Sequence, residues 1–187
     1  MKTSILEPGK FYHIYNRAKN GNPLFPDEED IQFFLRLYKR HIVPVAETWA
    51  YCILDDHVHF LVRMKEELNG NTFTPFALLF NSYSKGYHKK NGDEGPLFKF
   101  KLKRVEIRRE SVLRDVIRYI NQNARKHGVV EDCSSYRYSS FCATVTTWPT
   151  LIPKEEILRR FGNREMLSHI LAEPVKEKGL KMYLLEE

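Results

Sequence analysis

The sequence predicts an α+β protein in which helices pack against an antiparallel sheet. Segments whose apolar residues alternate, as in strands, are interspersed with segments whose apolar residues recur every three or four positions, as in helices. Two successive strand-like segments are separated only by Asp55-Asp56, which predicts a tight turn or a bulge between neighbouring strands. The predicted order is strand, helix, two strands, helix, strand and helix.

The first half of the chain supplies three of these strands and one helix. Residues 10 to 18 are rich in aromatic side chains and are followed by the turn residues 20 to 23, which predicts a strand and a loop. Acidic residues 27 to 30 suit the first turn of a helix, which Pro44 ends. Residues 46 to 54 and 57 to 64 have the composition of the next two strands.

The second half supplies two more helices and a basic strand. Thr74-Pro75 predicts a helix start with Thr as the cap, and aromatic residues along that helix, including Tyr83 and Tyr87, predict core packing. Residues 97 to 107 alternate between apolar and basic side chains, so we expect Lys99, Lys101 and Lys103 on one outer face of a strand. A further helix is expected from Ser111 to about Lys126, closed by Gly128.

This order of elements resembles a ferredoxin-like fold, an antiparallel sheet with helices on one face. We expect residues 1–130 to form the main domain. Residues 131–187 are expected to form a C-terminal extension that packs on or beside the domain. The segments 153 to 161 and 164 to 172 predict two short helices in this extension.

Composition and charge narrow the class of protein. The chain has 187 residues and no apolar run long enough to span a bilayer, and its first residues lack the apolar core of a signal peptide, so a cytoplasmic protein without a membrane partner is expected. The three cysteines match neither a zinc site nor a redox pair. The segment from Lys99 to His127 contains ten basic residues and three acidic ones, whereas the whole chain has a net charge of +6. This density of positive charge predicts that the protein binds a polyanion such as nucleic acid. The alternative is a charged face that contacts only solvent.

His57-Val58-His59 is the candidate metal motif. Residues two apart in a strand point to the same face, so both imidazoles leave one face of the sheet about 7 Å apart. Two imidazoles form half of a divalent-metal site. Because His-x-His also occurs by chance, a third ligand and a reactive group must be found elsewhere.

The helix that begins near Ser111 contains a candidate for the third ligand and a candidate for the reactive group. Its apolar positions define one stripe, and Tyr119 lies off this stripe with Asn123 on the same flank one turn later. Gln122 points nearly opposite the stripe, so Asn123 is the better-placed oxygen donor. The competing interpretation is a rim tyrosine that partly covers the core beside a solvated Asn123.

Three segments together resemble the REP-associated tyrosine transposases, a branch of the single-tyrosine HUH transposases. They are Phe11-Tyr12-His13-Ile14-Tyr15-Asn16-Arg17, His57-Val58-His59-Phe60-Leu61-Val62 and Arg118-Tyr119-Ile120-Asn121-Gln122-Asn123. The resemblance covers most of residues 10 to 141 and implies the HUH endonuclease fold. It implies that His57, His59 and Asn123 bind a divalent metal, Mg²⁺ or Mn²⁺, and that Tyr119 is the nucleophile.

The implied activity is cutting and rejoining of single-stranded DNA near a hairpin through a 5′-phosphotyrosine, by a monomer or homodimer that uses no small-molecule substrate. Phosphate contacts are expected from the basic residues of the last strand and helix, which are Lys99, Lys101, Lys103, Arg104, Arg108, Arg109, Arg114, Arg118 and Arg125. The C-terminal extension is a further candidate for DNA contact. The sequence departs from the family pattern at Asp55-Asp56, Lys101 and Ala124, and the first departure could add a carboxylate near the metal.

Two other functions compete with a transposase. A non-catalytic or domesticated DNA-binding regulator would keep the basic strand and lose metal dependence, and the four intact site residues count against it. A rolling-circle replication initiator or relaxase would share the chemistry, but the short chain and the position of the histidines before the tyrosine favour the transposase.

Overall fold

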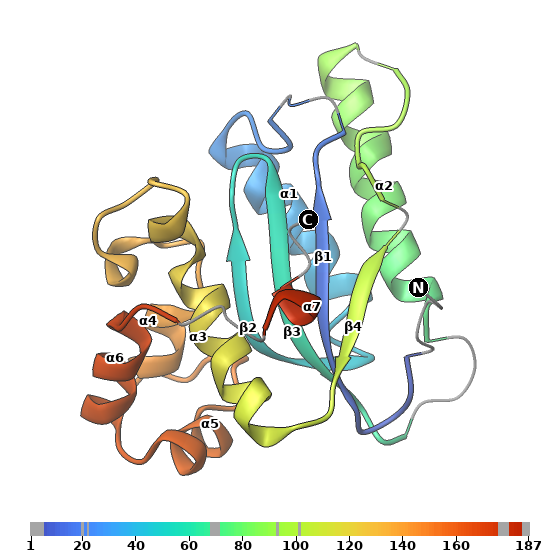
Figure 1. Ribbon diagram of the computed structural model, residues 1–187. Helices are drawn as coiled ribbons and strands as arrows, with labels where there is room; N and C mark the ends of the chain where they lie inside the picture. The colour runs from blue at the N-terminus through green and yellow to red at the C-terminus, as the bar shows by residue number, and fades with distance from the viewer. Residues whose placement is uncertain are drawn as a thin grey trace.

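The computed structural model describes residues 6–19, 21, 23–67, 72–92, 94–100, 102–175 and 180–184. Its centre is a four-stranded antiparallel sheet with the strand order β2-β3-β1-β4. The strands are β1 (Phe11–Arg17), β2 (Ala46–Ile53), β3 (His57–Met64) and β4 (Lys103–Ile107). The helices α1 (Glu28–His41) and α2 (Thr74–Asn91) connect β1 to β2 and β3 to β4. This arrangement confirms the α+β class and the ferredoxin-like topology (Figure 1).

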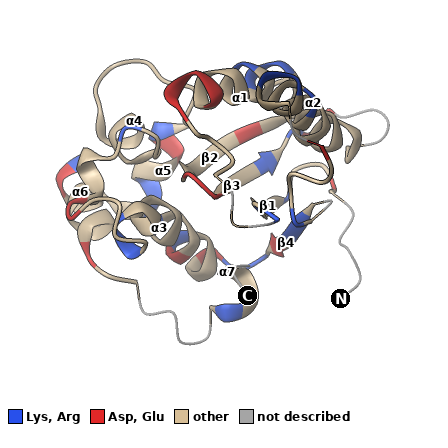
Figure 2. Ribbon diagram, turned by 90° about the horizontal axis from the view of Figure 1, so that it is seen from above, with Lys and Arg blue, Asp and Glu red and all other residues tan. Residues whose placement is uncertain are grey.

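Helices cover both faces of the sheet, which corrects the expectation of one face. The crossover helices α1 and α2 pack on one face, where Phe34 of α1 contacts Phe60 of β3. The helix α3 (Glu110–Lys126) packs on the opposite face against Ala50, Cys52 and Leu61. Figure 2 shows the sheet between these two layers. The reason is the apolar stripe of α3, which needs a second hydrophobic surface because α1 and α2 already occupy the first.

The alternation of side chains along β3 places His57 and His59 on the face of the sheet that α3 covers. In β3, Val58, Phe60 and Val62 pack into the cluster below α1 and α2, so the residues between them face α3. The register pairs Tyr15 of β1 with His59 of β3 and with Lys103 of β4. One surface of the sheet therefore carries both histidines of the motif, with Tyr15 of β1 and Cys52 of β2 as the cross-strand neighbours of His59.

The basic strand is shorter than the sequence predicts. Regular pairing in β4 begins only at Lys103, whereas residues 97 to 100 meet the end of β1 through an isolated bridge and one side chain. Asn16 donates from Nδ2 to the Phe100 carbonyl and accepts from the Phe100 amide, with distances of 3.0 Å and 3.3 Å. Because this side chain takes the place of a ladder partner, strand alternation does not extend back to Lys99. Lys101 lies outside the described residues.

The remaining helices are short and cluster around α3. They are α4 (Phe141–Val145), α5 (Lys154–Phe161), α6 (Arg164–Ala172) and α7 (Lys181–Leu184), with a 3₁₀ turn at Cys133–Ser135. The two helices predicted in the extension correspond to α5 and α6. Apolar residues of α5, α6 and α7 belong to the same buried cluster as those of α3. At the start of α2, the cap is Phe73 without a side-chain hydrogen bond, rather than Thr74, which lies inside the helix.

Candidate active site

The two histidines of the motif lie side by side on the α3 face of β3. Their ring centres are 5.2 Å apart and both side chains are buried. The tight turn at Asp55-Asp56 brings a carboxylate to the first of them, because Oδ1 of Asp56 accepts a hydrogen bond from Nδ1 of His57 at 2.5 Å. A carboxylate bound to the far ring nitrogen is the usual second partner of a metal-binding histidine, since it orients the ring and raises its basicity.

Asn123 of α3 meets His57 from the opposite side. Because Nδ1 of His57 donates to Asp56, the lone pair of the neutral ring lies on Nε2. This Nε2 atom lies 3.2 Å from Oδ1 of Asn123, which also carries lone pairs. With the amide turned by 180°, Nδ2 would take the place of Oδ1 and donate to His57 Nε2, whereas a cation held between the two residues would require Oδ1 to face Nε2.

The spacing of these two atoms fits a small divalent cation. Neighbouring ligands of an octahedral Mg²⁺ lie about 3 Å apart, because each metal–oxygen distance is about 2.1 Å. Within the described ranges no group of three or more His, Cys, Asp or Glu residues could hold a metal ion. The candidate donors are therefore His57, His59 and the amide of Asn123, a neutral set that suits an ion completed by phosphate and water oxygens.

Tyr119 is adjacent to this donor set. It precedes Asn123 by one turn of α3, and its ring centre lies 5.7 Å from that of His59. The sequence suggests a position on the polar flank beside Arg118 and Arg125, but the side chain is only 2% exposed. This flank is buried by chain segments that are far away in the sequence. The spacing of apolar residues along the helix does not indicate such contacts.

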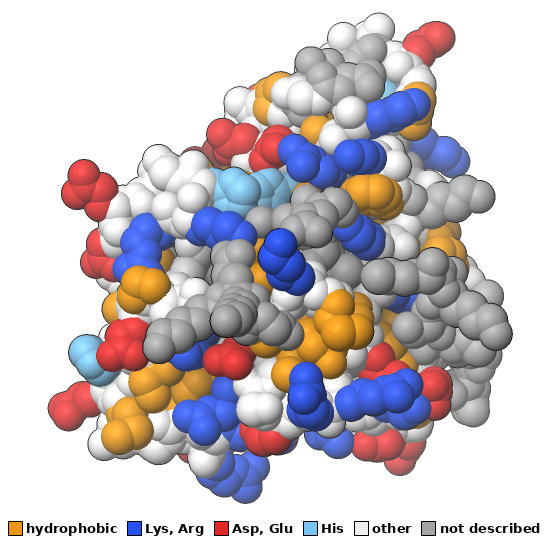
Figure 3. Space-filling model, in the orientation of Figure 1, with side chains coloured by type: hydrophobic (Ala, Val, Ile, Leu, Met, Phe, Trp, Pro, Cys, Tyr) orange, Lys and Arg blue, Asp and Glu red, His pale blue; other side chains and the backbone are white. Residues whose placement is uncertain are grey.

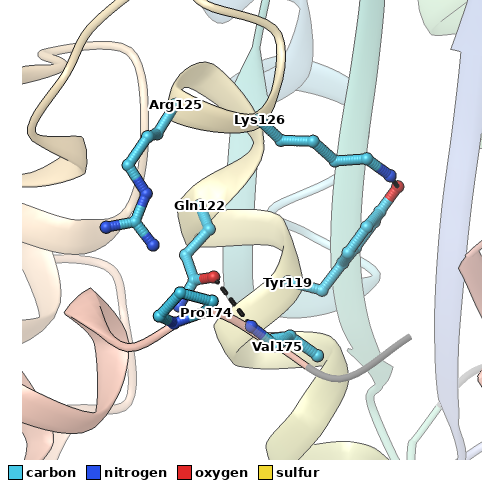
Figure 4. A pocket seen from close by; sticks show the side chains of 6 residues that line it. All are labelled: Tyr119, Gln122, Arg125, Lys126, Pro174 and Val175. Carbon is cyan, nitrogen blue, oxygen red and sulfur yellow. Dashed lines mark hydrogen bonds between the residues drawn. The ribbon is translucent and has the colours of Figure 1, made fainter. Parts of the chain in front are cut away.

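A pocket of about 240 Å³ lies directly beside Tyr119. It is lined by Tyr119, Gln122, Arg125, Lys126, Pro174 and Val175 (Figure 4). Lys126 donates to the Tyr119 hydroxyl at 3.3 Å, and its ammonium lies 4.7 Å from the ring centre. The phenol oxygen is thus in contact with a cation, which favours a negative charge on that oxygen.

The carboxylate that the sequence suggests near the metal is that of Asp56. Two other residues that contact the site, Lys126 and His13, have no role predicted from the sequence. Lys126 lies seven residues after Tyr119, a spacing that returns to the same helix face and could have indicated the contact. His13 contacts both His59 and Tyr119 from β1, and strand pairing between β1 and β3 was the signal that would have found it.

Most of the basic residues predicted to contact DNA fall into two groups, and the first borders the site. Lys99 and Lys103 both lie close to Phe100, with ammonium groups 5.5 Å and 5.2 Å from its ring centre. Lys103 also lies 5.9 Å from the ring centre of Tyr15, whose ring contacts that of His59 at 4.8 Å. These two lysines therefore lie beside the ring of Phe100, whose centre is 6.3 Å from that of Tyr15, instead of lying on the face of the strand opposite Phe100.

The second group is engaged with the protein itself. Arg104 stacks on Phe73, and its partial burial lowers its pKa, while Arg108 pairs with Glu106 at 2.8 Å. Arg114 lies over the ring of Phe161, and Arg118 donates to the carbonyls of Ile170, Glu173 and Pro174. Arg118 thus holds the segment after α6 against α3. Arg109 and Arg125 belong to neither group, since Arg109 is exposed at the N-cap of α3 and Arg125 lines the pocket beside Tyr119. Lys and Arg side chains are spread across this face of the molecule (Figure 3).

Comparison with known proteins gives the same fold. No protein-family model and no curated protein sequence matches the chain. Among solved structures, the chain is similar to a REP-associated tyrosine transposase bound to a REP hairpin, with a TM-score of 0.63 and 16% sequence identity. The alignment covers 80% of this chain and 88% of that one. The chain therefore has the fold of this transposase structure.

Two further structures are more distant. They are a bacterial tRNA(His) guanylyltransferase-like protein in complex with GTP, at 10% identity, and the tRNA(His) guanylyltransferase of Saccharomyces cerevisiae, at 11% identity. The alignments cover 67% and 91% of this chain, and 67% and 80% of the other two chains, each with a TM-score of 0.46.

In the part of the chain that the structure describes, no helix is long and apolar enough to cross a membrane.

Proposed function

We propose that the protein is a metal-dependent transposase of the single-tyrosine HUH type, which cuts and rejoins single-stranded DNA. The observation that carries the proposal is the approach of His57 Nε2 and Asn123 Oδ1 to 3.2 Å, next to a tyrosine, within the fold of a known transposase. The sequence resemblance assigns the same residues independently of this geometry. The agreement between the two favours a catalytic site over a buried structural cluster.

The proposed reaction is a phosphoryl transfer to Tyr119. Its phenol oxygen forms a bond to the phosphorus of the DNA backbone while the bond from phosphorus to the departing 3′ oxygen breaks. The phenol loses its proton, the 3′ oxygen takes one up, and no atom changes its oxidation state. The products are a 5′-phosphotyrosine and a free 3′-hydroxyl, which can later attack the phosphotyrosine and rejoin a strand without ATP.

The residues around Tyr119 each have a role in this step. His57, His59 and Asn123 would hold Mg²⁺ or Mn²⁺, which when bound neutralises phosphate charge and assists the departure of the 3′ oxygen. Asp56 orients His57 through the hydrogen bond at 2.5 Å. Lys126 stabilises the negative charge that forms on the phenol oxygen. Lys99 and Lys103 bind backbone phosphates beside the site, and the adjacent ring of Phe100 provides a surface on which a base stacks.

The proposed substrate is single-stranded DNA that carries a hairpin. The similar solved structure is described as bound to a REP hairpin, which supports this choice of substrate for the present chain. A single strand is also required by the reaction, because the scissile backbone must approach Tyr119 without its complementary strand.

The low exposure of Tyr119 favours a second candidate, a DNA-binding regulator without catalytic activity on the same fold. A phenol that is 2% exposed must gain access to DNA through the adjoining pocket before it can react. Such a regulator would bind the hairpin equally well with and without a divalent metal and would form no covalent product.

One experiment separates the two. The protein is incubated with 5′- or 3′-labelled hairpin DNA and Mn²⁺, and the products are run on a denaturing gel. We expect a protein–DNA adduct that carries only the 3′ label, because the protein retains the 5′ phosphate of the downstream fragment. Tyr119→Phe and excess chelator should each abolish the adduct, while the control Tyr87→Phe retains it. Hairpin binding without any adduct would favour the regulator.

A further inference from the structure

A chain of hydrogen bonds connects His59 to the C-terminal helix α7. Nδ1 of His59 lies 2.9 Å from Nε2 of His13, and Nδ1 of His13 lies 2.5 Å from the backbone carbonyl oxygen of Tyr183. The two imidazoles are stacked, with ring centres 5.1 Å apart, and both are fully buried. In Figure 1, α7 lies across the face of the sheet that carries these histidines.

The carbonyl at one end determines where each proton in this chain lies. A carbonyl oxygen can only accept, so Nδ1 of His13 must carry the proton of its hydrogen bond to Tyr183. In neutral His13, the form that a buried site favours, Nε2 is then an acceptor. The proton between the two rings must therefore belong to Nδ1 of His59. A neutral imidazole has one proton, so the lone pair of His59 lies on Nε2.

We propose that His13 is a positioning residue that holds His59 in the tautomer with the proton on Nδ1, and that the Tyr183 carbonyl fixes His13 in turn. Only this tautomer can offer Nε2 to a cation, because a metal-binding nitrogen must be unprotonated. The inference adds a role for β1 and α7 to the proposed cation site, and it rests on that site. It does not depend on the reaction at Tyr119.

The two histidines of the motif are then oriented by different partners. A carboxylate fixes His57, whereas a neutral imidazole and a carbonyl from the far end of the chain fix His59. The ring of Tyr119 also faces His13 edge-on, with centres 6.4 Å apart, but its contact is not the one that selects the tautomer. The state of the cation site consequently depends on α7 being seated on the sheet.

Two variants of His13 separate positioning from simple packing. His13→Gln keeps an oxygen that can accept from His59 and an amide group that can donate to the Tyr183 carbonyl. His13→Leu fills similar space and can do neither. Loss of a hydrogen-bonding partner behind a metal ligand typically weakens metal binding by about 10- to 100-fold. We therefore expect the dissociation constant for Mn²⁺ to rise by about tenfold or more in the Leu variant and by less than about threefold in the Gln variant.

Two measurements test the proposal without requiring DNA cleavage. Mn²⁺ binding is followed by the electron paramagnetic resonance signal of the free ion, and thermal melting verifies that both variants fold. Nitrogen-15 spectra of the histidine rings in the metal-free wild type report the tautomer of His59 directly, even if the Leu variant fails to fold. A proton on Nε2 of His59 would overturn the proposal, and so would equal Mn²⁺ affinities of the two folded variants. If the tautomer is as proposed but no DNA adduct forms, only the proposed function fails.

Discussion

Replacing Lys99 and Lys103 together with Gln should weaken binding of single-stranded DNA by an amount that depends on salt. Their ammonium groups lie 5.5 Å and 5.2 Å from the ring centre of Phe100, so each can contact one phosphate of a strand whose base stacks on that ring. Each phosphate contact on a single strand contributes about 0.7 to the slope of log affinity against log salt. Loss of two contacts should flatten the slope by about 1.4, which corresponds to roughly 25-fold weaker binding at 0.1 M salt and little change near 1 M.

The assay is fluorescence anisotropy of labelled single-stranded DNA at several salt concentrations. The matched control is the pair Lys39→Gln and Arg40→Gln, which removes the same charge from exposed positions of α1 on the opposite side of the sheet. We expect the control to keep nearly the wild-type slope. If both double variants flatten the slope equally, binding follows net charge rather than a defined path. If neither changes it, the path beside Phe100 is wrong, and Arg125 next to the pocket becomes the next position to test.

Three further predictions concern the site and the fold. Asp56→Asn should weaken Mn²⁺ binding by about tenfold or more, because the carboxylate behind His57 is lost, and an unchanged affinity in a titration would exclude this role. Lys126→Gln should slow adduct formation by about tenfold, equivalent to about 1.4 kcal/mol, with hairpin affinity nearly retained, and equal rates would show that the lysine does not act on the phenol. Phe34→Ala should lower the free energy of unfolding by about 3–5 kcal/mol in urea titrations, since the ring is fully buried against Phe60 and Tyr83, whereas a loss below about 1 kcal/mol would contradict the described core.

Local patterns in the sequence predict the sheet and its main helices because these patterns reflect which face of each element is buried. The two-residue spacing of His57 and His59 and the four-residue spacing of Tyr119 and Asn123 depend only on strand and helix geometry, and the structure brings all four residues together. Their roles in metal binding and catalysis remain predictions. The preference for Asn123 over Gln122 agrees with the geometry, since Gln122 instead binds backbone groups of Leu171 and Val175.

Contacts between distant segments could not be predicted in the same way. The alternation of residues 97 to 107 suggested a continuous strand, but the Asn16 side chain replaces the backbone ladder at Phe100. No local pattern indicates that Arg118, a predicted DNA contact, donates to the carbonyls of Ile170 in α6 and of Glu173 and Pro174 after it, which only the folded chain brings near. The contact between His13 and the Tyr183 carbonyl spans 170 positions, and no local pattern indicates it.

The central claim is that Tyr119 becomes covalently bonded to DNA phosphate, and identifying the modified residue by mass spectrometry tests it most directly. Wild-type protein is incubated with hairpin DNA and Mn²⁺, and the adduct is digested with nuclease and protease. We predict that the peptide containing Tyr119 carries a nucleotide attached through its 5′ phosphate to the phenol oxygen, and that this peptide is unmodified when chelator is present. A nucleotide on another residue, or modification of Tyr119 that persists in chelator, would contradict the account.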